Sequence, residues 1–205
     1  TYPYLKYLAD LGDEKYFWYL DRMSIFYASA PIALVFGLLL TKPLSRRFGK
    51  RNALIGLTMI NAFSVIAFYF VPAKNFEQIF WLNLVSAFFA GPMPALVWAI
   101  YTDVVDYGEW KFGRRITALT FAAAMLVQKA GLALGGWAVG MLLAYFGYVA
   151  NVEQSSESAH GILLMFSIIP GVLTILSGVA LFWYNLDDDE VEKIALELEK
   201  RRSEA

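Results

Sequence analysis

The charged residues of this 205-residue chain are clustered, and the gaps between clusters have the length of a lipid bilayer. Three gaps contain no charge and hold 19, 22 and 25 residues: Arg22 to Lys42, Arg51 to Lys74, and Glu77 to Asp103. Each exceeds the roughly 18 apolar residues that indicate a membrane-spanning helix. Two more apolar stretches, 116–146 and 162–184, are interrupted only by Lys129. Since backbone polar groups in lipid must be bonded within the segment, these lengths predict helices.

The composition agrees with a membrane protein. Hydrophobic residues make up 59% of the chain and charged residues 17%, whereas a soluble domain has about 45–50% and about 25%. We therefore predict an all-α, polytopic membrane helix bundle over residues 1–185, followed by a tail at 186–205. The predicted spans are about 23–41, 53–72, 78–102, 116–146 and 162–184.

The distribution of Lys and Arg between the loops predicts the orientation of the bundle. Five spans place loops alternately on two sides. The first side contains 12 Lys and Arg residues, in 42–52, 103–115 and the tail. The other contains three, in 10–22, 73–77 and 149–161. Because positive loops stay in the cytoplasm, the first side and the C-terminus are expected to be cytoplasmic.

The two ends of the chain carry further expectations. The chain begins without Met, and residues 1–10 read like the last turns of a helix, so we expect a segment of a longer protein. In the tail, acids precede bases, as suits the dipole of a helix. Its apolar positions allow an amphipathic helix, although a solvated tail fits equally well: Val191, Ile194, Leu196 and Leu198.

The composition also excludes several kinds of site. The absence of Cys rules out thiolate metal sites and a Cys nucleophile, and a single His rules out a multi-His cluster. The net charge of −1 gives no electrostatic basis for binding nucleic acid. We expect no metal site, no cofactor and no nucleic-acid partner.

Lys129 is the most informative single charge. It sits near the middle of the span 116–146, about 21 Å along the helix from Arg115. A lysine at the bilayer centre costs about 2.5–3.5 kcal/mol on insertion scales, so it normally faces a bundle interior or a watery cavity. The alternative is a structural lysine that snorkels or pairs. Gln128 points about 100° away, so both side chains reach one cavity only at its edges.

Glycine and proline mark two of the spans. Two GxxxG spacings, Gly131/Gly135 and Gly136/Gly140, permit close approach of another helix to 116–146. The run Gly91-Pro92-Met93-Pro94 interrupts the span 78–102. Broken helices at the membrane midplane often line substrate cavities, although a packing kink is the more common case.

The run 103–115 gathers charge at a helix end. Asp103 and Asp106 are spaced i, i+3, Glu109 continues the stripe, and Arg115 ends the run. Three interpretations remain open. The acids could pair with bases on a moving partner as a gate, hold Mg²⁺, or merely anchor the span. The loop 42–51, with five cations, is chiefly a topology signal, and a gating role for it needs more evidence.

The run DVVDYGEWK at 103–111 resembles the signature of the glycoside–pentoside–hexuronide:cation symporters. These form the branch of the major facilitator superfamily that includes melibiose permease. Other segments are similar to this family in the right order: PLSRRFGKR at 43–51, QKAG at 128–131, and FGYV and NVEQ at 146–154. The resemblance covers nearly the whole chain, but only the C-terminal half of such a transporter, with residues 1–10 ending helix seven.

The resemblance implies a secondary active transporter that couples a sugar or glycoside to Na⁺, H⁺ or Li⁺ by alternating access. In this family two six-helix bundles rock around a midplane site. The cation carboxylates lie mainly in the N-terminal half. Lys129 is implied in the sugar cavity, and we add Gln128, Trp98 and Tyr101, since sugar rings stack on aromatic side chains. The implied partners are the sugar, the cation, the bilayer of a bacterial inner membrane and an N-terminal half-bundle.

The resemblance also favours the gate among the interpretations of the charged run. The implied gate contains Asp103, Asp106 and Arg115, and we extend it with Glu109, Arg47 and Arg51. Two other functions remain possible. One is an intramembrane Mg²⁺-dependent transferase that uses Asp103 and Asp106, and the other is a non-transporting membrane sensor, because transporter folds are reused.

Overall fold

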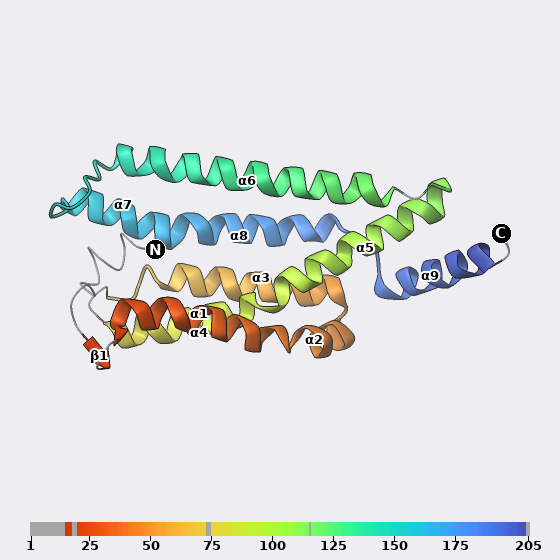
Figure 1. Cartoon of the computed structure of the whole chain (residues 1–205), viewed down its shortest axis with the longest axis horizontal. Coiled ribbons are helices and arrows are strands. Elements are labelled where there is room, and N and C mark those ends of the chain that lie inside the picture. Colours follow the sequence, from red (N-terminus) through yellow and green to blue (C-terminus); the bar gives the residue numbers. More distant parts are fainter. Residues whose placement is uncertain (1–14, 18–19, 73–74, 115, 204–205) are drawn as a thin grey trace.

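The computed structural model describes residues 15–17, 20–72, 75–114 and 116–203. The helices α1, α3, α4, α6, α7 and α8 run along the long axis of the molecule, α5 runs obliquely, the short helix α2 turns away from this direction, and α9 lies at one end (Figure 1). The prediction of an all-α membrane bundle is confirmed. A short antiparallel pair of strands, β1 (Lys15–Phe17) and β2 (Leu20–Asp21), precedes the first helix.

The long apolar helices follow the predicted order of apolar stretches, and two polar helices, α2 and α9, form in the predicted basic loop and tail. The helices are α1 (Arg22–Leu38), α2 (Thr41–Phe48), α3 (Lys50–Ala67), α4 (Phe76–Ala90), α5 (Pro92–Phe112), α6 (Thr117–Tyr145), α7 (Ser156–Phe166), α8 (Ile168–Ala180), the 3₁₀ turn η2 (Leu181–Trp183) and α9 (Asp188–Ser203). Asn75 and Ser155 cap the starts of α4 and α7 with their side chains, which satisfies free backbone amides there.

Three segments of the described chain are long and apolar enough to cross a membrane: Phe76–Phe112, Thr117–Tyr145 and Ser156–Trp183. The pair α1–α2, bent by 45°, makes a fourth when it is counted as one broken span. α3 occupies the predicted span 53–72 but begins at Lys50 and ends at Ala67. The polar residues of its first turn, Lys50, Arg51 and Asn52, lower the hydropathy of this 18-residue helix.

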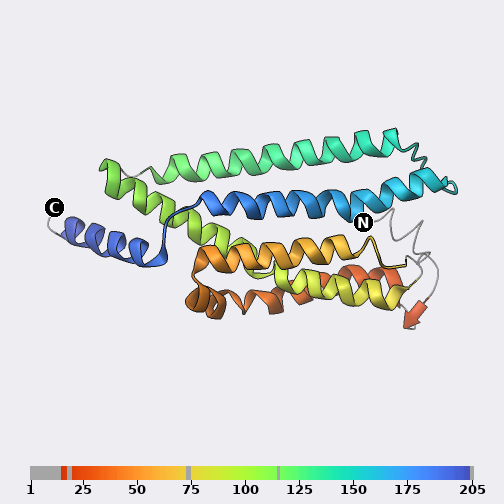
Figure 2. The ribbon, with the colours of Figure 1, turned by 180° about the vertical axis from the view of Figure 1, so that it is seen from behind.

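Two helix pairs form the tightly packed part of the bundle. α1 packs against α4, and α3 packs against α8, as the view from behind shows (Figure 2). Glycines allow these approaches. A Cβ at Gly37 or Gly91 would collide with backbone across the α1–α4 contact, and one at Gly178 would lie 2.5 Å from Met59. The break at Gly91 is therefore a place of close packing.

The core consists of two apolar clusters along the bundle. One lies toward the α7 end and the other toward the α9 end: Phe26, Phe68, Ile79 and Ile162, and then Ala53, Leu54, Leu57, Leu96 and Ile100. Between α3 and α4, the Asn61 amide donates to the Ser86 carbonyl and hydroxyl at 3.0 and 3.1 Å. Such polar contacts support association of helices in lipid.

α6 differs from the other long helices because none of its residues is buried. It runs along the edge of the bundle and contacts α5 and α7 (Figure 1). A Cβ added to Gly131, Gly135, Gly136 or Gly140 would meet nothing within 4 Å. Within the described residues, the close helix approach predicted from the two GxxxG spacings is not made.

Candidate functional site

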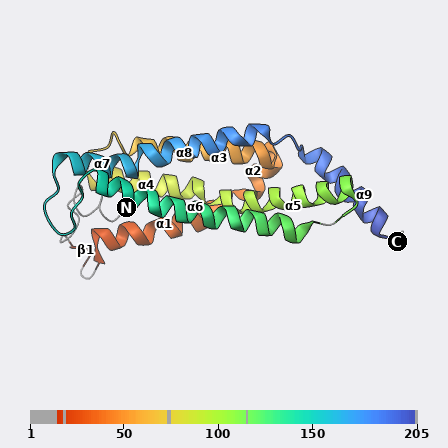
Figure 3. The ribbon, with the colours of Figure 1, turned by 90° about the horizontal axis from the view of Figure 1, so that it is seen from above.

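A cavity of about 450 Å³ is lined by residues of α1, α4, α5 and α6. Figure 3 shows α6 beside α5 in the view from above, whereas α6 and α1 lie on opposite sides of the bundle in Figure 1, so the cavity spans the width between them. Most of the lining is apolar, and the structure brings three of the predicted substrate residues to it: Trp98, Tyr101 and Gln128. The remaining lining residues are Leu34, Ala90, Met93, Pro94, Val97 and Ala124.

Ring contacts hold the aromatic side of this cavity in place. Trp98 stacks on Phe121 of α6, with ring centroids 5.7 Å apart and an 18° angle between planes. Tyr101 meets Trp98 edge to face at 5.7 Å. The cavity therefore offers flat apolar surface together with an indole N–H, a phenol and an amide, which can form hydrogen bonds.

Lys129 does not line this cavity. Its side chain is exposed on α6 and forms no ion pair with any residue that the structure describes. Neighbouring residues on a helix point about 100° apart, so Gln128 reaches the cavity while Lys129 lies outside it. The sequence analysis allowed both side chains to reach one cavity at its edges, whereas only Gln128 lines this cavity, so the substrate role of Lys129 stays a prediction.

A second polar site lies at the α9 end of the bundle and centres on Lys50. The Lys50 ammonium pairs with Asp103, whose side chain is only 10% exposed, and lies 3.8 Å from Asp188 Oδ1. The Lys50 backbone N–H donates to Asp188 Oδ2 at 2.8 Å. Because an ammonium has three donors, Lys50 can serve both carboxylates.

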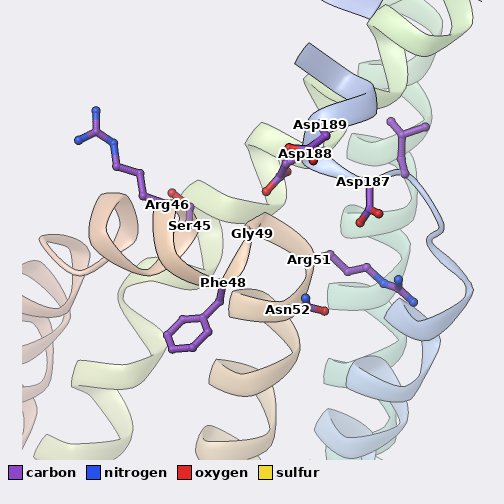
Figure 4. Close-up of a pocket in the computed structure, with 10 residues that line it drawn as sticks. Ser45, Arg46, Phe48, Gly49, Arg51, Asn52, Asp187, Asp188 and Asp189 are labelled. Carbon is purple, nitrogen blue, oxygen red and sulfur yellow. The ribbon is translucent and has the colours of Figure 1, made fainter. Parts of the chain in front are cut away.

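Gly49 makes this arrangement possible. Its φ of +79° suits glycine, and a Cβ there would lie 2.9 Å from Asp188 Oδ2. Figure 4 shows Asp188 beside the turn at Gly49, where Asp187–Asp189 line a polar pocket of about 280 Å³. The turn brings the start of α3 against the start of α9.

The arginines predicted for the gate have other contacts. Arg51 donates to the carbonyls of Leu181 and Phe182 at 3.2 and 2.7 Å and so attaches the start of α3 to the turn η2 that follows α8. The Arg47 guanidinium lies 5.5 Å from the centroid of the Phe48 ring. Neither arginine pairs with an acid among the described residues, and Arg115 lies outside them.

Lys50 was not predicted as the partner of Asp103. The basic loop contains five cations without a periodicity that singles out one of them, and only the turn at Gly49 aims Lys50 at α5. The sequence did signal α9, through its acid-first and base-last order. Ile194 and Leu198 are buried, so of the two interpretations left open for the tail the amphipathic helix fits the structure. Leu196 is 61% exposed, which corrects its assignment to the apolar stripe.

α9 packs on the last turns of α5 through polar contacts as well. The Arg202 guanidinium donates to Glu109 at 2.7 and 3.3 Å. The Trp110 indole N–H donates to Glu197 at 2.8 Å, and Arg201 pairs with Glu197 at 2.5 Å. The predicted gate acids are thus divided, with Asp103 held by Lys50 and Glu109 held by Arg202.

The electrostatics of this contact follow from the same partners. The hydrogen bond from Trp110, and then that from Arg201, lowers the pKa of Glu197, because both favour the carboxylate. Glu109, and more weakly Asp106, raises the pKa of Arg202. Asp106 itself forms no ion pair within the described part of the chain.

This geometry does not support the alternative interpretation of Asp103 and Asp106 as a magnesium site. The Asp103 carboxylate is occupied by the Lys50 ammonium. The described residues contain no group of three His, Cys, Asp or Glu side chains that could hold a metal ion. The chemistry that these contacts support is the making and breaking of ion pairs between helices.

Comparison with known proteins identifies the family. The family described as MFS/sugar transport protein matches residues 15–188. The chain belongs to this family. Its membership confirms the resemblance seen in the 103–111 run, and it assigns the bundle to the major facilitator superfamily of membrane transport proteins.

Individual relatives of this MFS sugar transport chain agree. A putative glycoside/cation symporter of Escherichia coli is 32% identical over 99% of this chain and 43% of its own length. An uncharacterized symporter of Bacillus subtilis is 36% identical over 75% of this chain and 33% of its own length. An uncharacterized 29.9 kDa protein of Pseudescherichia vulneris is 34% identical over 91% and 66%. The chain spans between a third and two thirds of these relatives.

Proposed function

We propose that this chain is part of a cation-coupled sugar symporter of a bacterial inner membrane, which works by alternating access. The observation that carries the proposal is the aromatic cavity between α1, α5 and α6, in a chain of the sugar transport family. The relatives are longer than the matched region, so the activity belongs to a longer protein that supplies a second bundle. The basic end of the bundle, with α9, is cytoplasmic in this proposal, and the protein is not an enzyme.

The chemistry of the cavity suits a glycoside. The apolar face of a sugar ring stacks on Trp98 and Tyr101. The Gln128 amide both donates to and accepts from sugar hydroxyls. Lys129 faces the volume shared with the second bundle, where its charge binds polar substrate groups or partner acids. The coupling cation, Na⁺ or H⁺, binds chiefly to carboxylates of that second bundle.

Uptake by the full-length protein in proteoliposomes tests this proposal. A panel of labelled glycosides is offered under an inward gradient of Na⁺ or of H⁺. Trp98→Ala is expected to reduce uptake at least about tenfold, because it removes the stacking surface. Trp81→Ala is the matched control, since Trp81 is 59% exposed and does not line the cavity.

Three results would contradict parts of the proposal. Equal losses in the Trp98 and Trp81 variants would remove the cavity as the substrate site. Uptake that ignores both gradients would remove cation coupling. Sugar binding without uptake under any gradient would favour the non-transporting sensor.

A further inference from the structure

We propose that α2 is a binding site for an anionic phospholipid, whose phosphate is held by the side chains of Lys42, Arg46 and Arg47. The site lies outside the aromatic cavity and does not depend on transport of a sugar. It depends on one part of the proposed function, the position of the basic end of the bundle in the cytoplasm. α2 is the segment Thr41–Phe48, and none of its residues is buried.

Three of the five cations in the segment 42–51 have no acidic partner among the described residues. Lys50 pairs with Asp103, and Arg51 donates to carbonyls of η2. The other three are exposed and form no ion pair with any residue of the described chain: Lys42, Arg46 and Arg47. α2 contains no acid, so its three positive charges are not compensated within the helix.

The three cations lie on the side of α2 that faces away from the bundle. Lys42 and Arg46, four residues apart, share one face, and Arg47 lies about 100° further around the helix. Leu44, on the other side, packs against the apolar cluster of α3 and α5. Like charges four residues apart destabilise a helix. An anion bound between these cations would therefore stabilise α2.

Exposed apolar side chains lie beside the cations. Phe48, the last residue of α2, is 51% exposed, and Leu39, just before the helix, is 73% exposed. The Phe48 ring and the Arg46 side chain point in opposite directions (Figure 4). A basic helix with an apolar edge lies at the boundary between headgroups and acyl chains. The ring is therefore placed to contact acyl chains, while Arg46 reaches the headgroups.

The cations have the chemistry that a phosphodiester requires. A guanidinium offers two parallel N–H donors to phosphate oxygens, and a lysine ammonium adds a compact positive charge. The Arg47 guanidinium lies 5.5 Å from the centroid of the Phe48 ring, a cation–π contact that keeps it at the edge of the apolar surface. Clusters of Lys and Arg next to a span bind anionic headgroups on the cytoplasmic side. A lipid supplies both the phosphate for the cations and the acyl chains for the ring.

Acidic side chains are the competing ligands, and the geometry favours the lipid. Arg46 lines the polar pocket that contains Asp187–Asp189, but its side chain extends away from these acids (Figure 4). On α1, Leu34 lines the aromatic cavity, whereas Phe36, 60% exposed, lies about 160° away around the helix. The exposed apolar side of α1 that leads into α2 thus faces away from the cavity, and away from the second bundle that closes the cavity in the proposed function.

Lipid binding by the full-length protein tests this site. The purified protein in detergent is titrated with phosphatidylglycerol, which is anionic, or with phosphatidylcholine, which is zwitterionic, and native mass spectrometry counts the bound lipids. We expect the parent protein to prefer phosphatidylglycerol. In the combined variant Lys42→Gln, Arg46→Gln and Arg47→Gln, the affinity for phosphatidylglycerol should fall at least about fivefold, and the affinity for phosphatidylcholine should not change.

The matched control removes three exposed cations that lie outside α2 at the same end of the bundle: Arg114→Gln, Lys193→Gln and Lys200→Gln. Its net charge changes by the same amount, so it should bind phosphatidylglycerol as the parent protein does. Equal losses in the two combined variants would assign the binding to overall charge and overturn the site. Where the α2 variant does not fold, Arg46→Gln alone is compared with Lys193→Gln, and the same order is expected.

Other outcomes would identify a different ligand. An excess of inorganic phosphate should not displace phosphatidylglycerol, because it has no acyl chain to contact Phe48, and displacement would overturn the lipid in favour of a soluble anion. Retention of phosphatidylglycerol by the α2 variant, together with loss of sugar uptake, would assign the cations to acids of the second bundle. A parent protein that binds both lipids equally also overturns the proposal. Sugar uptake is measured separately, so its absence would overturn the transport function and not the lipid site.

Discussion

The helices α1, α4 and α6 are about equally apolar. However, α1 and α4 are packed closely against each other, whereas α6 is exposed along its whole length. In the pair, Gly37 and Gly91 let backbone approach backbone so closely that no Cβ would fit. In α6, four glycines face open space and no residue is buried. The difference shows that glycines permit a close approach of helices but do not produce one, and that the surface of α6 is not covered by the described chain.

In the proposed function, this exposed helix contributes to the substrate site. α6 supplies Ala124 and Gln128 to the cavity lining, and its Phe121 stacks on Trp98. If α6 meets both a substrate and a second bundle, as proposed, the described bundle cannot pack against it on all sides. This fits the few contacts of α6, which are mainly with α5 and α7.

The largest effect is expected from Gly37→Ala. Its Cβ would collide with the Phe88 backbone, which cannot move aside like a side chain. Overpacking of this kind costs about 3 kcal/mol, so thermal unfolding of the full-length protein in detergent should begin at a lower temperature. Gly56→Ala is the control, because nothing lies within 4 Å of its Cβ position. Equal unfolding temperatures of the Gly37 and Gly56 variants would contradict the close backbone contact between α1 and α4.

A smaller loss is expected from Asp103→Asn. It leaves the Lys50 ammonium, 24% exposed, with only the more distant Asp188. Breaking a partly buried pair costs about 2 kcal/mol, less than for a fully buried one. Asp106→Asn removes a carboxylate that forms no ion pair with the described residues and should leave the unfolding temperature unchanged. The reverse order would show that Asp106, not Asp103, carries the contact.

Lys129→Ala is expected to separate activity from stability. Coupled uptake should fall about tenfold, since a lysine at this depth is retained for a cavity or partner role. The unfolding temperature should not change, because the side chain is exposed on α6. Leu126→Ala, at an equally exposed position of α6, is the control. Normal coupled uptake by Lys129→Ala would remove it from the transport site.

The smallest effect is expected from pH at the α5–α9 contact. Folding lowers the pKa of Glu197 below its ordinary 4.5, so this group contributes stability above pH 4.5 and loses it as pH falls through the lowered value. Hydrogen exchange of α9 should therefore increase below about pH 4.5, and Glu197→Gln should remove part of that increase. Glu199→Gln is the control, and identical profiles in all three proteins would contradict the assignment.

Much of the bundle could be predicted from the sequence. Charge-free gaps of bilayer length indicated the long helices, and the order of acids and bases indicated α9, because both depend on local properties of the chain. The end of α1 at Leu38 agrees with the predicted span 23–41, whose end is marked by Lys42. The helical form of the basic segment 41–48, the 45° bend that leads into it and the early end of α3 could not be predicted, because they depend on the helices packed around them.

The candidate sites divide in the same way. The sequence by itself determined the membrane class, the family and the residues that carry unusual chemistry, Lys129 and the acids of 103–109, because a charge in an apolar stretch stands out without coordinates. Only the tertiary structure decided which groups meet. It brought Trp98, Tyr101 and Gln128 to one cavity, and it gave Asp103 to Lys50 instead of to an arginine. The reason is that such partnerships depend on a turn at Gly49 and a helix docked through Ile194 and Leu198, and no spacing along the chain encodes the distance between them.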